Sequence, residues 1–279
     1  MSGCGGKLYV VGTPIGNLED MTYRAVRILS EADFICAEDT RVTRRLLTHF
    51  GISKPLYSCH KFTERQAVQG FAQKIADGAV CAVVSDAGMP CISDPGEELV
   101  KICRDMGISV ESVPGPTAVT TAAAICGMSA ARFAFEGFLS VHKKHRRERL
   151  EELKNDRHTL IFYEAPHKLR ATLSDLYDAF GDRQTAICRE LTKIHEEVLR
   201  MSLSEAIQYY QEKDPKGEYV LVVEGAAVTE ESTYTLEDGT AEAQRLINEG
   251  MKATEACKQA AKLTGFRKSE IYDALSSLD

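Results

Sequence analysis

The stretch from Ser85 to Gly96 crowds residues that can bind a small molecule into one loop: it reads Ser-Asp-Ala-Gly-Met-Pro-Cys-Ile-Ser-Asp-Pro-Gly. It follows the apolar residues Val83 and Val84 and combines two carboxylates with hydroxyls and glycines. Glycine lets a ligand approach the backbone closely, and Pro90 and Pro95 stiffen the turn. Because ligands of open α/β sheets bind where strands end, we expect a ligand site here. The alternative is a long turn with two solvated aspartates.

A second stiff turn has two prolines around a glycine, in the sequence Val-Pro-Gly-Pro at 113–116. It leads into Thr117 and Ala118, where an alanine-rich helix is predicted to start. The N-terminus of a helix has free backbone N–H groups, so this turn can also face a ligand.

Glu190 and Lys193 follow a predicted strand and have the chemistry of a proton acceptor. A general base typically contributes about 10²–10⁴-fold to a reaction that must remove a proton. Lys193 can act in this way only if burial or a positive neighbour lowers its pKa. The alternative is a structural ion pair between the two side chains.

The elements that position these loops alternate between strands and helices along the first half of the chain. Apolar runs predict strands at 7–12, 34–37, 79–84 and 108–113, and 55–58 is a candidate for another. Helical apolar faces lie between them. This order predicts a mostly parallel sheet with covering helices.

The second half has a higher strand content, with strands predicted at 133–138, 159–163, 185–188 and 219–224, and it predicts a mixed sheet. From about Leu236 the pattern is helical only, and the last two helices are joined by a glycine turn as in a helix-turn-helix. We therefore expect an α/β fold in three domains, at residues 1–114, 115–228 and 236–279.

Composition limits the classes of protein that the chain can represent. Its 279 residues suit two domains with a small appendage. Nine cysteines, an odd number without a Cys-x-x-Cys pair, indicate reduced thiols and argue against structural zinc. The N-terminus lacks the apolar core of a signal peptide and no run is long enough to span a membrane, so we expect a cytoplasmic protein.

The segment Thr13 to Asn17 lies where a helix N-terminus could hold a phosphate. It has one glycine where a dinucleotide fingerprint needs three, and it lacks the Gly-Lys-Ser/Thr of a triphosphate loop. Dehydrogenase and nucleoside triphosphatase functions are thereby excluded. With the arginines at 41–45, this segment is better interpreted as an RNA-facing wall.

A net charge of −7 provides no overall positive field, so an RNA partner must meet local basic patches. For the run 142–149 the alternative is a solvated helix start, since Glu148, Glu151 and Glu152 lie within salt-bridge reach. For the last helices the alternative is a cap that packs on the body. His142 and His145 are spaced to bind a metal, but such histidines are more often phosphate contacts or surface, and we expect no metal. The predicted RNA contacts are Asn17, Arg41, Arg44, Arg45, Lys143, Lys144, Arg146, Arg147 and Lys268.

Six motifs in order give the chain a family resemblance over nearly its whole length. It resembles the bacterial small-subunit ribosomal RNA 2′-O-methyltransferases that modify a decoding-site cytidine, within the tetrapyrrole methylase superfamily. It departs from them at Met89, where threonine is usual, and in 59–64, where a His/Asn-rich segment is usual. The motifs lie at residues 8–18, 37–41, 85–88 with 92–96, 114–116, 162–167 and 189–193.

The resemblance implies two α/β domains with S-adenosylmethionine in the interdomain cleft, a homodimer, and a small C-terminal helix-turn-helix-like module. It also implies small-subunit ribosomal RNA, free or in the assembled subunit, as the substrate. Two other functions stay open: a superfamily methyltransferase acting on a tetrapyrrole or another small acceptor, and a non-enzymatic nucleic-acid-binding protein. The predicted cofactor-binding residues are Asp86, Ala87, Gly88, Met89, Ile92, Ser93, Thr117, Ala118, Tyr163, Glu164 and Ala165.

Overall fold

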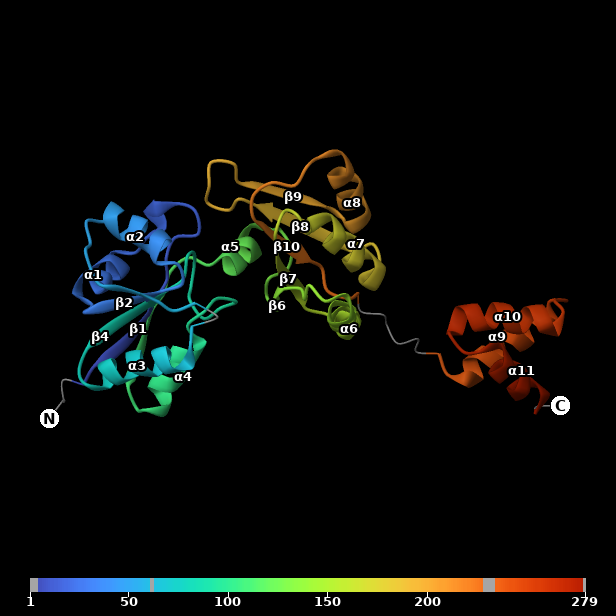
Figure 1. Cartoon of the computed structure of the whole chain (residues 1–279). Helices are drawn as coiled ribbons and strands as arrows, with labels where there is room; N and C mark the ends of the chain where they lie inside the picture. The colour runs from blue at the N-terminus through green and yellow to red at the C-terminus, as the bar shows by residue number, and fades with distance from the viewer. Residues whose placement is uncertain (1–4, 61–62, 228–233, 278–279) are drawn as a thin grey trace. The chain divides into compact units, whose positions relative to one another are not determined.

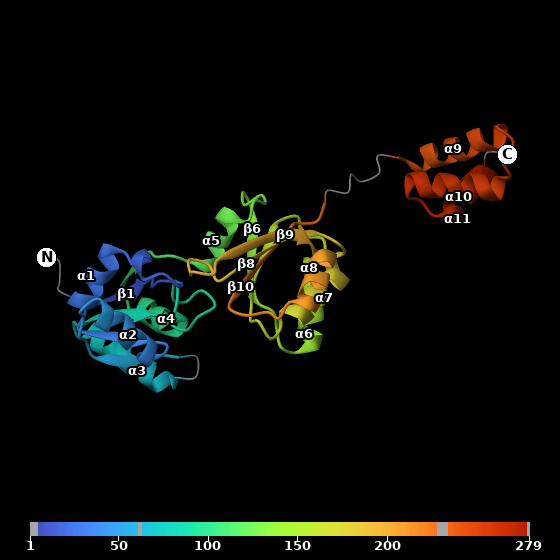
Figure 2. The ribbon, with the colours of Figure 1, turned by 90° about the horizontal axis from the view of Figure 1, so that it is seen from above.

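The computed structural model describes residues 5–60, 63–227 and 234–277, so Lys61 and Phe62 of the segment 59–64 lie outside the described residues. The chain forms two compact units, residues 1–226 and 227–279. The first unit contains two five-stranded sheets, and helix α5 (Ala118–Ile125) lies between them in both views (Figure 1, Figure 2). The predicted α/β fold class is confirmed.

The first sheet is parallel throughout, in the order β3-β2-β4-β1-β5. Helices α1 and α2 pack on one face and α3 and α4 on the other, which is why all four residues of β2 are buried. Because β1 and β4 are parallel neighbours, the loop 85–96 lies beside the segment that follows β1. The elements are β1 (Lys7–Val11), α1 (Tyr23–Glu31), β2 (Phe34–Ala37), α2 (Thr40–His49), β3 (Leu56–Ser58), α3 (Arg65–Ala76), β4 (Val80–Val84), α4 (Glu97–Asp105) and β5 (Ser109–Val113).

The second sheet is mixed, in the order β6-β7-β10-β8-β9, with only β6 and β7 parallel. Helix α5 packs on one face, and α6, α7 and α8 pack on the other. The sequence analysis did not predict β9 or α8, although Ser202 and Glu205 form a capping box at the start of α8. The elements are β6 (Phe133–Phe138), α6 (Lys143–Leu153), β7 (Thr159–Glu164), α7 (Leu169–Phe180), β8 (Gln184–Arg189), β9 (Glu197–Ser202), α8 (Leu203–Glu212) and β10 (Tyr219–Val223).

The second unit is helical, with α9 (Leu236–Asn248), α10 (Ala253–Thr264) and α11 (Lys268–Ser276). Its core is small and built mainly from Ala243, Cys257, Ala260 and Ile271. The turn between α10 and α11 contains Gly265 in the left-handed region, at φ +81°. This unit corresponds to the helical segment expected from about Leu236.

The cysteines that the structure describes are free thiols, and all of them except Cys91 are buried. Within the described residues, no helix combines the length and the apolar character needed to cross a membrane. The same residues contain no group of three or more His, Cys, Asp or Glu side chains arranged to hold a metal ion.

Candidate active site

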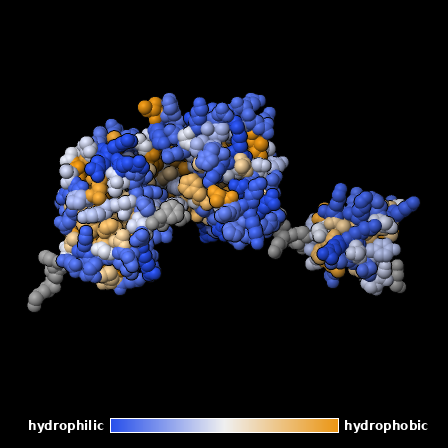
Figure 3. Space-filling model, in the orientation of Figure 1, coloured by the Kyte–Doolittle hydropathy of each residue, from blue (hydrophilic) through white to orange (hydrophobic). Residues whose placement is uncertain are grey.

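A cavity of about 500 Å³ opens where the strands of the two sheets end. Its volume is typical of pockets for small organic ligands. Figure 3 shows that the first unit is hollowed between its two halves, with apolar surface beside the hollow. Asp86 and Ser93 are absent from the lining. The predicted cofactor residues that line the cavity are Ala87, Gly88, Met89, Ile92, Thr117, Ala118, Tyr163, Glu164 and Ala165.

Three glycines allow the loops after β1, β4 and β5 to meet. Thr13 and Gly88 exchange backbone hydrogen bonds of 2.9 and 3.1 Å, and Gly88 has a φ of +83°. A Cβ on Gly12 would lie 2.7 Å from Cα of Gly115 and 2.7 Å from Sδ of Met89. A side chain at Gly12 or Gly115 would therefore push the loops apart, and one at Gly88 would strain the backbone at its positive φ.

Two residues of the loop 85–96 other than glycine adopt left-handed backbone conformations, Cys91 at φ 70° and Ser93 at φ 63°. Such conformations cost of order 1–3 kcal/mol each and persist where surrounding contacts enforce them. Ser93 packs against β6, since a Cβ on Gly137 would lie 2.7 Å from Ser93 Oγ. Ile92, between these two residues, and Asp94, directly after them, line the cavity.

Three carboxylates gather at this loop: Glu38 and the loop residues Asp86 and Asp94, none of which has a recorded ion pair among the described residues. The Asp86 carboxylate accepts a hydrogen bond from the Asp39 N–H at 3.0 Å, and the Asp86 N–H donates to Glu38 at 3.3 Å. Burial raises the pKa of Glu38 and of Asp86. Burial, together with the nearby Glu38 carboxylate, raises the pKa of Asp94 to about 6. Of the three, only Asp94 lines the cavity.

A second cavity of about 590 Å³ lies beside Asp94 on the side of Glu38 and Gly96. Ser93, His60 and Cys59 also line it. Asp94 is the one residue, among those described, that lines both cavities. Asp94 therefore lies at their junction.

The start of α5 forms another wall of the first cavity. Thr117 caps the helix by accepting a hydrogen bond from the Thr120 N–H, and the Tyr163 hydroxyl accepts one of 3.0 Å from the Val119 N–H. In the part of the chain that the structure describes, no partner is recorded for the Ala118 N–H. That donor is available to a ligand in the cavity, which Ala118 lines.

Glu164 lines the cavity, but its carboxylate has structural partners. It accepts hydrogen bonds from the Ala165 N–H at 2.8 Å and from the Thr172 hydroxyl at 2.5 Å, and the residue is only 5% exposed. These bonds fix the turn after β7 against α7. The Glu164 carboxylate therefore fixes the position of Ala165 in the cavity wall.

Glu190 and Lys193 lie outside the lining of both cavities and form an ion pair of 2.9 Å. Lys193 also pairs with Glu218 at 2.8 Å, and the Glu218 N–H donates to Glu190. Burial alone would raise the pKa of Glu190, but the Lys193 ammonium and the Glu218 N–H hold it below its usual value.

The pKa of Lys193 is raised, because its two carboxylate partners outweigh the effect of burial. Lys193 could act as a base only if its pKa were lowered. In this arrangement its pKa is not lowered. The alternative of a structural ion pair is the geometry observed. Leu191, between the two side chains in sequence, lines the cavity.

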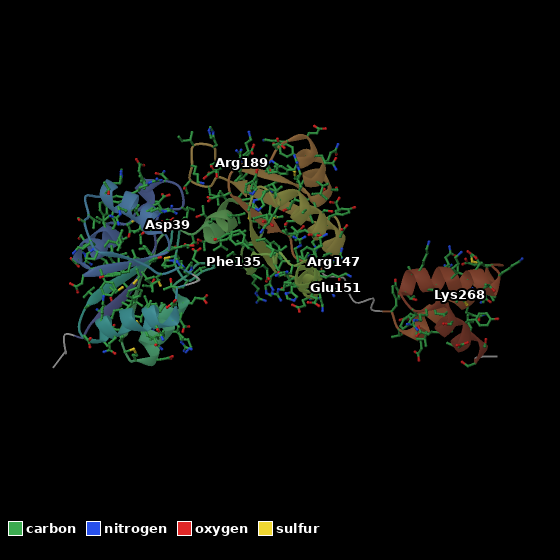
Figure 4. The ribbon with its side chains drawn as sticks, in the orientation of Figure 1. Asp39, Phe135, Arg147, Glu151, Arg189 and Lys268 are labelled. Carbon is green, nitrogen blue, oxygen red and sulfur yellow. The ribbon has the colours of Figure 1, made fainter. Side chains whose placement is uncertain are left out.

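The predicted RNA contacts divide by their surroundings. Asn17 caps a short 3-10 helix (Leu18–Asp20), and Arg41 pairs with Asp39 at 2.6 Å, which lowers the pKa of Asp39 to about 2. Arg146 is only 13% exposed and pairs with Asp175 of α7 at 2.7 Å, so it anchors α6. Arg41 remains exposed in spite of its pairing. Figure 4 labels two of the exposed residues, Arg147 and, in the helical unit, Lys268. The other exposed residues are Arg44, Arg45, Lys143 and Lys144.

Half of the residues that line the cavity were not predicted from the sequence. Asp94 had a visible signal, since it lies in the loop singled out first. Leu191 and His167 lie inside quoted motifs, whereas Glu218 to Val220 had no local signal, because antiparallel pairing of β10 with β7 brings them to the site. The lining residues outside the prediction are Ile15, Asp94, Phe138, Pro166, His167, Leu191, Glu218, Tyr219 and Val220.

One parallel and one mixed sheet, with a ligand-sized cavity where their strands end, define a class of two-sheet α/β protein. Comparison with known proteins gives the family. Residues 7–207 match the family model of the Tetrapyrrole (Corrin/Porphyrin) Methylases. The chain belongs to this family.

Curated relatives cover nearly the whole chain. A protein of Halalkalibacterium halodurans named ribosomal RNA small subunit methyltransferase I is 45% identical over 271 residues, 96% of this chain and 94% of that protein. A protein of the same name from Thermotoga maritima is 46% identical over 220 residues, which are 79% of this chain and 99% of that protein. The matched length of the second relative is close to that of the unit 1–226.

Solved structures share the fold. One is a uroporphyrin-III C-methyltransferase from Thermus thermophilus complexed with S-adenyl homocysteine. It is 19% identical, covers 78% of this chain and 97% of its own, and has a TM-score of 0.55. At this identity the likeness shows the arrangement of the two sheets alone.

Proposed function

We propose that this chain methylates the ribose 2′-hydroxyl of a cytidine in small-subunit ribosomal RNA, with S-adenosylmethionine as the methyl donor. The observation that supports it best is the cavity at the strand ends, in a chain that aligns over 96% of its length with a relative named as a small-subunit ribosomal RNA methyltransferase. The relatives' names favour this function over a small-acceptor methyltransferase and over a non-enzymatic binding protein. S-adenosylmethionine supplies a methyl group on a positively charged sulfonium sulfur.

The lining of the cavity fits such a cofactor. Its volume of about 500 Å³ suits a nucleoside joined to an amino acid, and Ile15, Leu191 and Val220 provide apolar surface. The lining also includes polar residues, among them Asp94, His167 and Glu218, and the Ala118 N–H has no recorded partner among the described residues. Asp94 also supplies negative charge that suits a cationic ligand.

Asp94 is our candidate for the group that accepts the proton of the ribose hydroxyl. It lies at the junction of the two cavities, where a methyl acceptor bound in one cavity can approach the methyl donor bound in the other. With a pKa of about 6 it is ionised at neutral pH and yet close enough to that pH to be an efficient base. Glu190 and Lys193, paired with each other outside the cavities, are better suited to position the loop that carries Leu191.

The exposed basic residues of α2 and α6 and Lys268 are the proposed RNA contacts, and Arg146 is not among them, because it is paired and nearly buried. The helical unit contains no residue of either cavity, so its proposed role is to hold the substrate. Truncation after Thr235 should leave cofactor affinity unchanged and raise KM for the small subunit more than it lowers kcat. Loss of cofactor binding would contradict this role.

A homodimer and a cytoplasmic location are further parts of the proposal, carried by the family resemblance. Light scattering of the purified protein tests the first, since a particle of one chain's mass of 30.8 kDa would contradict it. Fractionation of cells together with their ribosomes tests the second.

The decisive experiment incubates purified, unmodified small subunits with the protein and S-adenosylmethionine that carries an isotope-labelled methyl group. Nuclease digestion followed by mass spectrometry then identifies the labelled nucleoside. Labelled 2′-O-methylcytidine is the expected product, and Asp94→Asn is the matched variant with reduced yield. A methyl group on a cytosine base, or on another nucleoside, would contradict the proposal.

A further inference from the structure

An aromatic side chain that the proposed function has not used stands at the mouth of the first cavity. Phe138, the last residue of β6, lines this cavity and is 57% exposed. Its ring contacts Tyr163 with centroids 5.6 Å apart and an interplanar angle of 67°. Ile92, also exposed, lines the same cavity. One flank of Phe138 is thus fixed by another ring while the rest is open to solvent.

Basic residues lie at the same edge of the sheet. Because β6 and β7 are parallel and α6 connects them, α6 begins at the edge where β6 ends and the cavity opens. Lys143 and Lys144 occupy its first turn and Arg147 its second, and all three are exposed. Figure 4 labels Arg147 on this helix.

Apart from Arg146, which pairs with Asp175, the basic side chains at the start of α6 are less neutralised than those at its end. Among the described residues no ion pair is recorded for Lys143 or Arg147, and Lys144 only approaches Glu148, at 3.9 Å. Toward the end of the helix, Arg149 pairs with Glu136 at 2.8 Å and Lys154 pairs with Glu151 at 3.1 Å. Like charges one turn apart disfavour a helix, so the start of α6 is not arranged for its own stability.

We propose that Phe138 stacks on a nucleobase of the RNA strand beside the methylated nucleotide, and that Lys143, Lys144 and Arg147 contact phosphates of that strand. This inference rests on the proposed function. An aromatic face next to a basic surface is the arrangement that binds single-stranded nucleic acid, because every base has a π-face and every nucleotide a phosphate. In a chain of net charge −7, the complementary charge must be local, as it is here.

A fluorescence experiment tests the stacking directly. The chain contains no tryptophan, so Phe138→Trp introduces a single reporter. A short single-stranded oligoribonucleotide that contains cytidine, added to protein saturated with S-adenosylhomocysteine, should quench this fluorescence with a saturating curve. Phe133→Trp, at the opposite end of β6, is the matched control and should show no RNA-dependent quenching. Quenching by S-adenosylhomocysteine alone, with none from RNA, would show that Phe138 belongs to the cofactor wall and overturn the proposal.

A kinetic experiment tests what the contact contributes. Phe138→Ala should raise KM for the small subunit by about 5- to 150-fold, the range that stacking on one base corresponds to, with cofactor Kd nearly unchanged. Phe138→Tyr should restore KM, and Phe133→Ala should leave it unchanged. A rise in cofactor Kd without a rise in KM would overturn the proposal.

The phosphate contacts are read from the salt dependence of RNA affinity. Replacing Lys143, Lys144 and Arg147 together by glutamine should reduce the slope of log affinity against log salt by about 2, roughly 0.7 for each phosphate of a single strand. Lys154→Gln, at the far end of α6, is the control. An unchanged slope would overturn this part. The product made by the unaltered protein tests the methylation itself, so the two proposals can fail separately.

Discussion

The two halves of the first unit each bring a group of carboxylates to the strand ends, and the two groups differ in their charge balance. Glu38 lies near Asp86 and Asp94 of the loop 85–96, and all three have raised pKa values. Across the cavity, Glu190 and Glu218 share Lys193, and the pKa of Glu190 is lowered.

The difference separates a group free to act from a group that holds structure. Carboxylates of both groups accept hydrogen bonds, but a desolvated carboxylate without an ion-pair partner has a proton affinity suited to chemistry, whereas pairing with a cation stabilises the ionised form. The cavity lining agrees with this division of roles, since it includes Asp94 but neither Glu190 nor Lys193. Glu218 is the exception, because it belongs to the paired group and also lines the cavity.

The largest expected effect comes from removing the charge of the unpaired group at the cavity. Asp94→Asn should lower kcat for methylation by about 10²–10⁴-fold, the usual contribution of a general base, while cofactor Kd changes by less than tenfold. Single-turnover kinetics and calorimetry measure the two quantities. The limb of the pH–rate profile near pH 6 should disappear in this variant. An unchanged kcat would show that Asp94 takes no part in the chemistry. The two groups of carboxylates would then not differ in function as described.

Removing the cation of the paired group should affect stability instead. Lys193→Met leaves the Glu190 and Glu218 carboxylates without their shared partner, which should lower the free energy of unfolding by about 1.5–3 kcal/mol. Urea denaturation measures this loss. The control is Lys101→Met, whose partner Asp105 forms an exposed helical pair worth about 0.3–0.5 kcal/mol. If Lys193→Met instead lowered kcat about 10²-fold or more and left stability unchanged, Lys193 would act as a base.

The two groups should also give opposite pH dependences. In the folded state the pKa of Asp94 is about 6, above its unfolded value, so its ionisation destabilises the fold progressively as pH rises from about 4 to about 6. Solvent screening at this half-buried side chain limits the loss to about 1 kcal/mol. Glu190, with a lowered pKa, contributes stability that is present above its unfolded pKa and is lost as pH falls through its folded pKa.

Denaturation curves of Asp94→Asn and Glu190→Gln across this pH range separate the two contributions. Relative to the unaltered protein, the first variant should gain stability between pH 4 and 6. The second should lose most above the unfolded pKa of Glu190. Parallel pH profiles for both variants would show that the two groups do not differ in the way described.

Local patterns predicted most of the fold and part of the site. The apolar runs that predicted β1, β2 and β4 are strands because both faces of a parallel sheet are buried. The loop 85–96 was found because glycine, proline and carboxylates are unusual together directly after such a strand. Neither observation needs knowledge of distant contacts.

The remainder of the site depends on pairings that a single sequence does not display. Tyr219 and Val220 reach the cavity because β10 is inserted between β7 and β8. The role of Lys193 depends on Glu218, which is distant in sequence, and Arg146 is removed from the surface by Asp175 of α7. A basic side chain in a charged run looks the same whether it is exposed or paired with another helix.

The smallest expected effect distinguishes members of the unpaired group from one another. Asp86 does not line the cavity; its carboxylate accepts a hydrogen bond from the N–H of Asp39, which caps α2. Asp86→Ala should therefore act through the position of the neighbouring loops and weaken cofactor binding by about 2- to 12-fold, the equivalent of one ordinary hydrogen bond. Calorimetry with S-adenosylhomocysteine measures the change, with Asp39→Ala as the comparison: it keeps the backbone N–H that donates to Asp86 and removes only the side chain that caps α2. A loss of kcat as large as that of Asp94→Asn would place Asp86 at the chemistry and make the acidic group, rather than Asp94 alone, the active element.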